Sequence, residues 1–224
     1  MSILWSLSPG NRREGELPSS TRSTTLCALV LRFYRHRVNS IAELDAIPPE
    51  HGIEFDLRSD GDDVIVTHDP FTRGPTIEEF FPRIKRRPCI FNVKCEGIEP
   101  RVLMAASKHG IDDFFFLDLS IPAAIKMVRT GEHRVAVRYS EYEPVEGVLA
   151  WRGLARWVWV DCFTAYPTEP RAWKAIAEAF QLCLVSPELQ GHGLNVIADF
   201  RASLADLRFD AVCTKRRDCW DTLQ

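Results

Sequence analysis

The sequence predicts a single-domain α/β protein, a closed (β/α)8 or TIM barrel. Short apolar segments alternate with helix-like segments, and eight of the apolar segments fit this rhythm. Strands that are apolar on both faces are typical of a parallel sheet covered by helices, and eight such units close a barrel. An open doubly wound sheet would have fewer strands and usually a glycine-rich turn after the first one. Here the first strand leads instead into His36-Arg37-Val38-Asn39.

The predicted barrel strands are short and rich in β-branched or aromatic residues, which favours extended structure. In chain order they are residues 26–34, 53–57, 89–93, 114–118, 135–139, 157–160, 182–185 and 211–214. One extra strand, 64–67, follows Asp60-Gly61. That dipeptide favours a tight turn, so a β-hairpin is expected there.

The predicted helices carry apolar residues at helical spacing between the strands; they are residues 100–109, 122–129, 168–180 and 195–207. Gly110 and Gly131 follow the first two and are typical C-terminal stops. Residues 1–25 are rich in Ser, Arg, Gly and Pro and show no periodicity, which predicts a poorly structured extension. The barrel domain is therefore expected to cover residues 26–224.

The composition limits the classes of function. Of the 224 residues 46% are hydrophobic, too many for a disordered chain. The net charge of -3 argues against an electrostatic grip on nucleic acid or on an anionic membrane surface. No apolar segment reaches the ~18–20 residues that cross a bilayer. Seven cysteines without a C-x-x-C pair predict buried free thiols and the reducing cytoplasm; five lie in apolar segments, namely Cys27, Cys89, Cys162, Cys183 and Cys213.

Polar residues gather at the predicted C-terminal ends of the strands, where barrel enzymes have their active sites. They are His36, Arg37, Glu54, Asp56, His68, Asp69, Asn92, Lys94, Asp118, Arg138, Glu141, Asp161, Ser186, Glu188, Thr214 and Lys215. One histidine at a strand end is usually structural. Two histidines, each with a charged neighbour, Arg37 or Asp69, are harder to explain as structural residues.

Glu54 and Asp56 share one face of their strand, because side chains alternate with a period of two. Paired carboxylates in a barrel interior or mouth need a cation, since burying two negative charges together is unfavourable. Hard oxygen ligands favour Mg²⁺ or Ca²⁺ over zinc. The pair therefore predicts a divalent metal ion or a bound cationic group.

These motifs together resemble a known family. The N-terminal signature of the glycerophosphodiester phosphodiesterases is similar in order and spacing to His36-Arg37-x-Asn39, Glu54-x-Asp56, Asp60-Gly61 and His68-Asp69. That family consists of (β/α)8 barrels that hydrolyse phosphodiesters with a bound divalent cation. The strongest similarity covers residues 35–69, and the barrel rhythm extends it over nearly the whole chain from Leu26.

The resemblance implies a role for each matching residue. His36 and His68 would be the catalytic acid–base pair, and Arg37 would bind a phosphoryl oxygen. Glu54 and Asp56 would hold the cation, Mg²⁺ or Ca²⁺. The expected substrate is a small-molecule phosphodiester, hydrolysed to an alcohol and a phosphomonoester in lipid metabolism.

Two positions depart from the family pattern. A metal-binding carboxylate usually stands two residues before a lysine on the third barrel strand, and here Asn92 precedes Lys94. By the resemblance Asn92 is the third metal ligand and Lys94 binds the substrate phosphate. Val38 replaces the glycine that usually follows His-Arg.

Other interpretations remain open at this stage. A catalytically inactive barrel that binds a phosphorylated ligand would explain Asn92. A sugar isomerase or an aldolase could use Lys94 or Lys215 to form a Schiff base, but it would not explain the paired histidines. Ser186 and Glu188 could line the headgroup pocket or cap a helix, and Arg138 could shape the substrate site or close the mouth.

Overall fold

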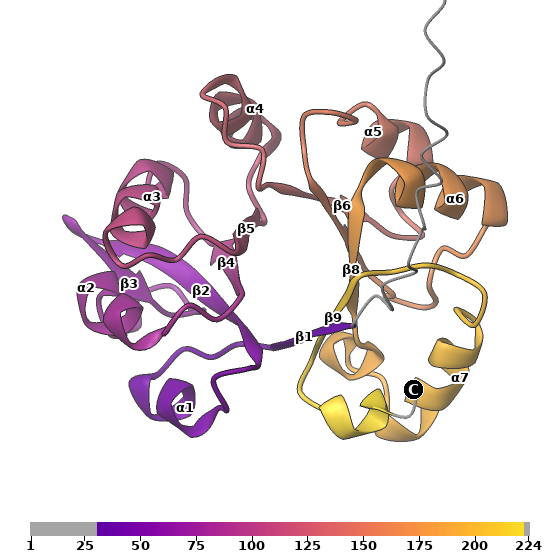
Figure 1. Cartoon of the computed structure of the whole chain (residues 1–224), viewed down its shortest axis with the longest axis horizontal. Coiled ribbons are helices and arrows are strands. Elements are labelled where there is room, and N and C mark those ends of the chain that lie inside the picture. The colour runs from indigo at the N-terminus through magenta and orange to yellow at the C-terminus, as the bar shows by residue number, and fades with distance from the viewer. Residues whose placement is uncertain (1–30, 222–224) are drawn as a thin grey trace, which may run out of the picture.

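The computed structural model describes residues 31–221, which form a nearly closed barrel with helices on its outside (Figure 1). Eight parallel strands make the barrel: β1 (Arg32–Arg35), β2 (Gly52–Asp60), β4 (Cys89–Val93), β5 (Phe114–Leu117), β6 (Ala136–Tyr139), β7 (Trp157–Val160), β8 (Gln181–Val185) and β9 (Ala211–Thr214). Their order is β5-β4-β2-β1-β9-β8-β7-β6. The predicted fold class, a single-domain (β/α)8 barrel, is confirmed.

The ninth strand, β3 (Asp63–Val66), pairs antiparallel with the end of β2. Asp60 faces Asp63 across a two-residue loop, where Gly61 has a positive φ of 59°. After β3 the chain returns to the barrel mouth, and the Thr67 amide donates to the Asp56 carbonyl at 3.0 Å. The predicted hairpin is therefore confirmed, and it brings the residues after Thr67 next to β2.

Helices follow most of the barrel strands; they are α1 (Ile41–Ala46), α2 (Ile77–Phe80), α3 (Glu99–Lys108), α4 (Ile121–Arg129), α5 (Val145–Leu149), α6 (Pro170–Ala179) and α7 (Ile197–Ala202). Short 3-10 turns cover Phe81–Arg83, Pro187–Gln190, Leu194–Val196 and Arg217–Cys219. Among residues 31–221, the helices are all too short or too polar to cross a lipid bilayer.

The barrel interior is apolar at its floor and polar at its mouth. The rings of Tyr34, Phe115 and Trp157 fill the floor, with centroids 5.9 Å apart for Tyr34 and Phe115 and 4.6 Å for Phe115 and Trp157. Gly52 is required beside them, because a Cβ there would lie 2.6 Å from the Tyr34 ring. Glu54 is the next residue on this face of β2, so the apolar floor ends directly below the polar mouth.

The seam between β5 and β6 is the weakest part of the barrel wall. One isolated bridge between Phe116 and Val135 spans it in the described part of the chain, and the Phe116 amide donates to the Arg134 carbonyl at 2.8 Å. All other neighbouring barrel strands share continuous ladders. Figure 1 shows α4 and α5 standing apart over this seam.

Most predicted elements agree with the structure within a few residues. The strands predicted at 89–93, 157–160 and 211–214 have the observed bounds. Cys89, Cys162, Cys183 and Cys213 are buried and free, as expected. Cys27, the predicted extension 1–25 and the first residues of the strand predicted from residue 26 lie outside the described part of the chain.

The helix predicted at 195–207 is wrong in its extent. A 3-10 turn occupies Leu194–Val196, and α7 ends at Ala202. The Ser203 hydroxyl donates to the Phe200 carbonyl at 2.6 Å, and the Leu204 amide donates to the Arg201 carbonyl three residues back. The hydroxyl competes for the carbonyl that would continue the α-helical ladder, so the helix tightens and stops.

Replacing Phe91 with alanine should lower the free energy of unfolding by about 3–5 kcal/mol, because it leaves a cavity between the barrel and its helices. Phe91 is fully buried on β4, and its ring centroid lies 4.4 Å from that of Phe114. Urea unfolding followed by circular dichroism measures the change. Phe71→Ala is the matched control, because Phe71 is fully exposed and its loss should cost under about 0.5 kcal/mol. Equal losses in the two variants would contradict the observed packing.

Candidate active site

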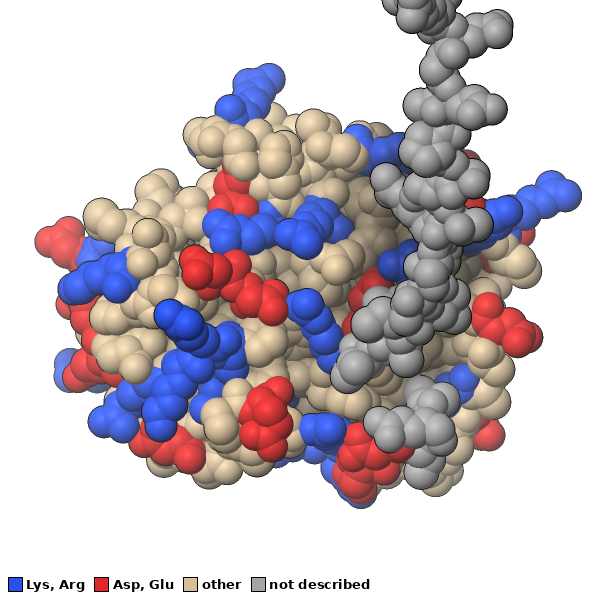
Figure 2. Space-filling model, viewed as in Figure 1, with Lys and Arg blue, Asp and Glu red and all other residues tan. Residues whose placement is uncertain are grey.

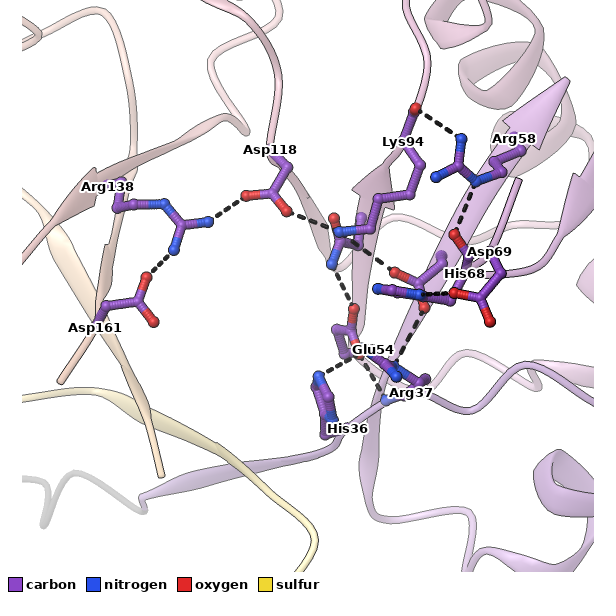
Figure 3. Close-up of polar contacts among 12 residues, drawn as sticks. His36, Arg37, Glu54, Arg58, His68, Asp69, Lys94, Asp118, Arg138 and Asp161 are labelled. Carbon is purple, nitrogen blue, oxygen red and sulfur yellow. Dashed lines mark hydrogen bonds and ion pairs between the residues drawn. The ribbon is translucent and has the colours of Figure 1, made fainter. Parts of the chain in front are cut away.

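The barrel mouth brings together all seven residues that the sequence predicts for the site; they are His36, Arg37, Glu54, Asp56, His68, Asn92 and Lys94. They lie on β2 and β4 or follow β1, β3 and β4. Figure 3 shows His36, Arg37, Glu54 and His68 as one group, with Lys94 next to it. The register of the sheet sets part of this arrangement, because Asp56 on β2 pairs directly with Asn92 on β4.

The two carboxylates of β2 are almost completely buried. Glu54 accepts hydrogen bonds from the Arg37 amide at 2.6 Å and from Asn92 Nδ2 at 2.8 Å. Asp56 accepts one from Asn39 Nδ2 at 2.7 Å, and its other oxygen lies 3.5 Å from Lys94 Nζ. Burial, and after it the Asp56 carboxylate, raises the pKa of Glu54 above its usual value.

Arg37 reaches this pair through an unusual backbone conformation. Its φ of 55° lies in the left-handed region, which costs energy for a residue with a Cβ. The conformation aims the amide at Glu54 and leaves the side chain 43% exposed, with Nε 3.9 Å from Asp56. The guanidinium is thus placed to meet an anion that enters the mouth.

His36 is held in its neutral form. Burial lowers its pKa to about 3, and the positive charges of Arg37, Lys215 and Lys94 add to the effect. Its Nε2 lies 3.8 Å from Glu54 Oε2, and its buried Nδ1 has no hydrogen-bond partner among the described residues. A neutral imidazole has a lone pair that can accept a proton, but a pKa this low makes His36 a weak base in this state of the site.

His68 is more exposed and is held by a carboxylate. Its Nδ1 lies 2.7 Å from Asp69 Oδ1, so Nδ1 donates and Nε2 is left for other contacts. Arg58 fixes the backbone here, with Nε donating to the His68 carbonyl at 2.8 Å and Nη1 to the Lys94 carbonyl at 3.2 Å. Sequence reasoning missed Arg58; its signal was the side-chain alternation along β2, which places it on the same strand face as Glu54 and Asp56.

A row of alternating charges continues from Lys94 across the mouth (Figure 3). Lys94 Nζ lies 2.9 Å from Asp118, and Arg138 binds both Asp118 and Asp161. Gln190 donates to the other oxygen of Asp161. We call Lys94, Asp118, Arg138 and Asp161 the charge ladder. Burial alone would raise the pKa of Asp118, but Lys94 and Arg138 outweigh it and lower that pKa.

The loop after β8 has a structural role in this arrangement. Glu188 accepts from the Thr214 hydroxyl at 2.6 Å and from the Lys215 amide at 3.0 Å. Trp220 Nε1 donates to the Ser186 hydroxyl at 2.8 Å. These contacts fasten strand ends together, which is neither of the two roles expected from the sequence, and Ser186 makes no side-chain capping bond to the 3-10 turn that follows it.

The oxygen atoms of Glu54, Asp56 and Asn92 are of the chemical type that a hard divalent cation binds. Asn92 Oδ1 is buried and has no hydrogen-bond partner in the part of the chain that the structure describes. Two buried carboxylates and an unpartnered amide oxygen are all oxygen ligands, as Mg²⁺ and Ca²⁺ prefer. Residues 31–221 hold no cluster of three His, Cys, Asp or Glu suited to a metal, so such a site would depend on the amide.

A cavity of about 570 Å³ adjoins the charge ladder at the β5–β6 seam. Its lining is mostly apolar, with Leu117, Ile121, Val148 and Trp151 among its residues, and Asp118 and Arg138 border it.

Comparisons with known proteins agree with this architecture. No protein-family model matches the sequence, and neither does any curated protein. A glycerophosphodiester phosphodiesterase from Agrobacterium tumefaciens superposes with a TM-score of 0.63 at 15% identity, over 85% of this chain and 99% of that one. A glycerophosphoryl diester phosphodiesterase from Parabacteroides distasonis gives 0.60 at 12% identity, over 87% of both chains. The shared feature is the TIM-barrel fold.

His36 should remain neutral down to about pH 4, one pH unit above its lowered pKa. Because burial lowers that pKa, the ring takes up a proton only as the pH falls toward 3. Nuclear magnetic resonance of ¹⁵N-histidine-labelled protein, with His36→Asn to assign the signal, measures this titration. A midpoint near the unperturbed value of about 6.5 would contradict the buried, positively surrounded environment.

Proposed function

We propose that the protein is a phosphodiesterase of the glycerophosphodiester phosphodiesterase type, acting on a small-molecule phosphodiester. The observation that carries this proposal is the single group of two histidines, a buried carboxylate pair and an exposed arginine at the barrel mouth. The shared fold of the two phosphodiesterase structures is consistent with it. At their identities, however, fold alone does not assign an activity.

The residues of the mouth match the needs of the reaction. A phosphodiester is an anion that repels nucleophiles, so positive charge on its non-bridging oxygens lowers the barrier. The Arg37 guanidinium binds one of these oxygens. Neutral His36 accepts the proton of the attacking hydroxyl, from water or from the substrate itself. His68, held at Nδ1 by Asp69, delivers a proton from Nε2 to the leaving alkoxide.

The proposed cofactor is Mg²⁺ or Ca²⁺, held by Glu54, Asp56 and Asn92. Support comes from the unpartnered Asn92 Oδ1 and from the raised pKa of Glu54, which is caused by burial and by the neighbouring Asp56 carboxylate. When bound, such a cation supplies positive charge to the phosphoryl group. Lys94 contributes to the same field but is itself bound by Asp56 and Asp118.

The same contacts argue against a Schiff-base enzyme. Lys94 Nζ lies within 3.5 Å of Asp56 and 2.9 Å of Asp118, so the amine is engaged by two carboxylates. A nucleophilic lysine needs an unprotonated amine, which this environment opposes.

The proposal is tested with a panel of glycerophosphodiesters that differ in their alcohol. Release of alcohol and phosphomonoester is measured with Mg²⁺ or Ca²⁺, and again with a chelator. Turnover that the chelator abolishes is the expected result. Binding of the panel without any turnover would instead identify an inactive barrel that holds a phosphorylated ligand.

His36→Ala and His68→Ala should each lower turnover by ~10²–10⁴-fold, because each removes one of the two proton-transfer groups. Circular dichroism confirms that the variants are folded. His109→Ala is the control, since His109 follows α3 and lies outside the mouth, and it should leave turnover unchanged. Near wild-type turnover in both site variants would refute the acid–base assignment.

Asn92→Asp should tighten binding of Mg²⁺ and Ca²⁺ by ~10-fold, because a carboxylate adds a negative charge to the ligand set. Calorimetric titration measures the affinity, and the metal concentration for half-maximal activity should fall with it. Asn39→Asp is a matched control, because Asn39 donates to Asp56 as Asn92 donates to Glu54, but the Asn39 Oδ1 already accepts from the Asp56 amide. If the metal affinity rises equally in both variants, the added negative charge explains the rise and direct ligation by residue 92 does not. If neither gains, Asn92 does not ligate the metal.

A further inference from the structure

Exposed apolar side chains gather around the mouth of the barrel. Seven large apolar side chains are exposed in the described part of the chain, and five lie in the segments that follow the C-terminal ends of β3, β5, β6, β7 and β8. The five, which we call the apolar rim, are Phe71, Ile121, Tyr142, Phe163 and Leu194. Such strand-to-helix segments form the mouth face of a barrel. Met104 and Leu154, the other two, lie in α3 and between α5 and β7.

The rim side chains protrude singly, except for one aromatic pair. Phe71 is fully exposed, Tyr142 is 72% exposed and Ile121 is 69% exposed. Tyr142 and Phe163, from the segments after β6 and β7, form a pair with ring centroids 5.9 Å apart. Single exposed apolar residues are normal on protein surfaces. Here, however, they come from five different segments on the face of the barrel that carries the polar mouth, which a random scatter does not explain.

We propose that the apolar rim docks the mouth onto a lipid surface, so that phosphodiester headgroups of the lipids meet the candidate active site. The choice of occupant rests in part on the proposed phosphodiesterase function, because each phospholipid headgroup contains a phosphodiester. A lipid surface is fluid and accepts isolated protruding side chains, whereas a protein partner needs a contiguous complementary patch. Aromatic side chains such as Tyr142 are suited to the boundary between headgroups and acyl chains.

The polarity of the mouth complements the layers of such a surface. The exposed Arg37 guanidinium is on the same mouth face as the rim, so it would lie level with the phosphates while the rim enters the apolar layer. The apolar cavity at the β5–β6 seam includes the rim residue Ile121, so it offers space for part of an acyl chain next to the charge ladder.

Docking of this kind depends on apolar contact rather than on overall charge. The net charge is -3, and on the face in Figure 2 positive and negative side chains are interspersed. An anionic surface would therefore gain little from attraction to the whole protein. The structure thus points to binding of zwitterionic phosphatidylcholine that is insensitive to salt.

The test is sedimentation of the full chain with phosphatidylcholine vesicles at low and high salt. Wild type should bind under both conditions. The double variant Phe71→Ser with Tyr142→Ser should lower the partition coefficient by at least ~10-fold, because two buried aromatic contacts are lost. Met104→Ser with Leu154→Ser is the matched control, since it removes two exposed apolar side chains away from the mouth, and it should bind like wild type.

Three outcomes would overturn the proposal. The first is no vesicle binding by wild type, and the second is binding that the rim variant leaves unchanged or that salt abolishes. The third is a dimer of the wild type in analytical ultracentrifugation that the rim variant disperses, which would make the rim an interface between copies of this chain. Vesicle binding needs no turnover, so a failure of the phosphodiesterase assay is separate from a failure of docking.

Discussion

The buried carboxylates of Glu54 and Asp56 are the constraint on which the mouth of this barrel depends. Two negative charges on one strand face, shielded from water, require donors and positive charge close by. The segment after β1 supplies the Arg37 amide and the Asn39 side chain, and β4 supplies Asn92. The bond from the Arg37 amide requires the energetically unfavourable left-handed backbone conformation of Arg37. The same bonds place the arginine and the first histidine at the opening, so the needs of the carboxylates position the groups proposed for catalysis.

The charge ladder has a second consequence, for the barrel wall itself. Between β5 and β6 a single backbone bridge spans the seam in the described chain, whereas Arg138 on β6 binds Asp118 after β5 and Asp161 after β7. Ion pairs at the mouth thus connect strands that the backbone ladder barely joins. Lys94 and Arg138 are each engaged by two carboxylates, while the Arg37 guanidinium has one long contact to Asp56. Arg37 is accordingly the cation best placed to exchange its partner for a ligand.

The sequence was sufficient to predict the barrel and the grouping of the site, because both follow from local pattern. Strands that are apolar on both faces indicate a parallel sheet covered by helices. Barrel active sites lie at the C-terminal ends of the strands, and this rule identified the site residues on and after β1 to β4. The short helices α1 and α2 were missed although Ser40 with Glu43 and Thr76 with Glu79 form capping boxes, since four to six residues show no periodicity. The charge ladder could not be predicted, because it depends on which side chains meet across the opening. The apolar rim depends in the same way on how each connecting segment turns.

The charge balance of the mouth shows how one amide changes what the site can hold. The carboxylate pair and the charge ladder together contain four carboxylates, Glu54, Asp56, Asp118 and Asp161, and the three cations bound to them are Arg37, Lys94 and Arg138. With all of them ionised and His36 neutral, the balance is one negative charge. A carboxylate in place of Asn92 would give this set of groups a net charge of minus two, and a bound divalent cation would bring it only to zero. With the amide, the proposed cation leaves the mouth with one positive charge, and a phosphodiester carries one negative charge. In the proposed function Asn92 would thus weaken the hold on the metal and strengthen the attraction for the substrate, because every charge at the mouth acts on both ligands.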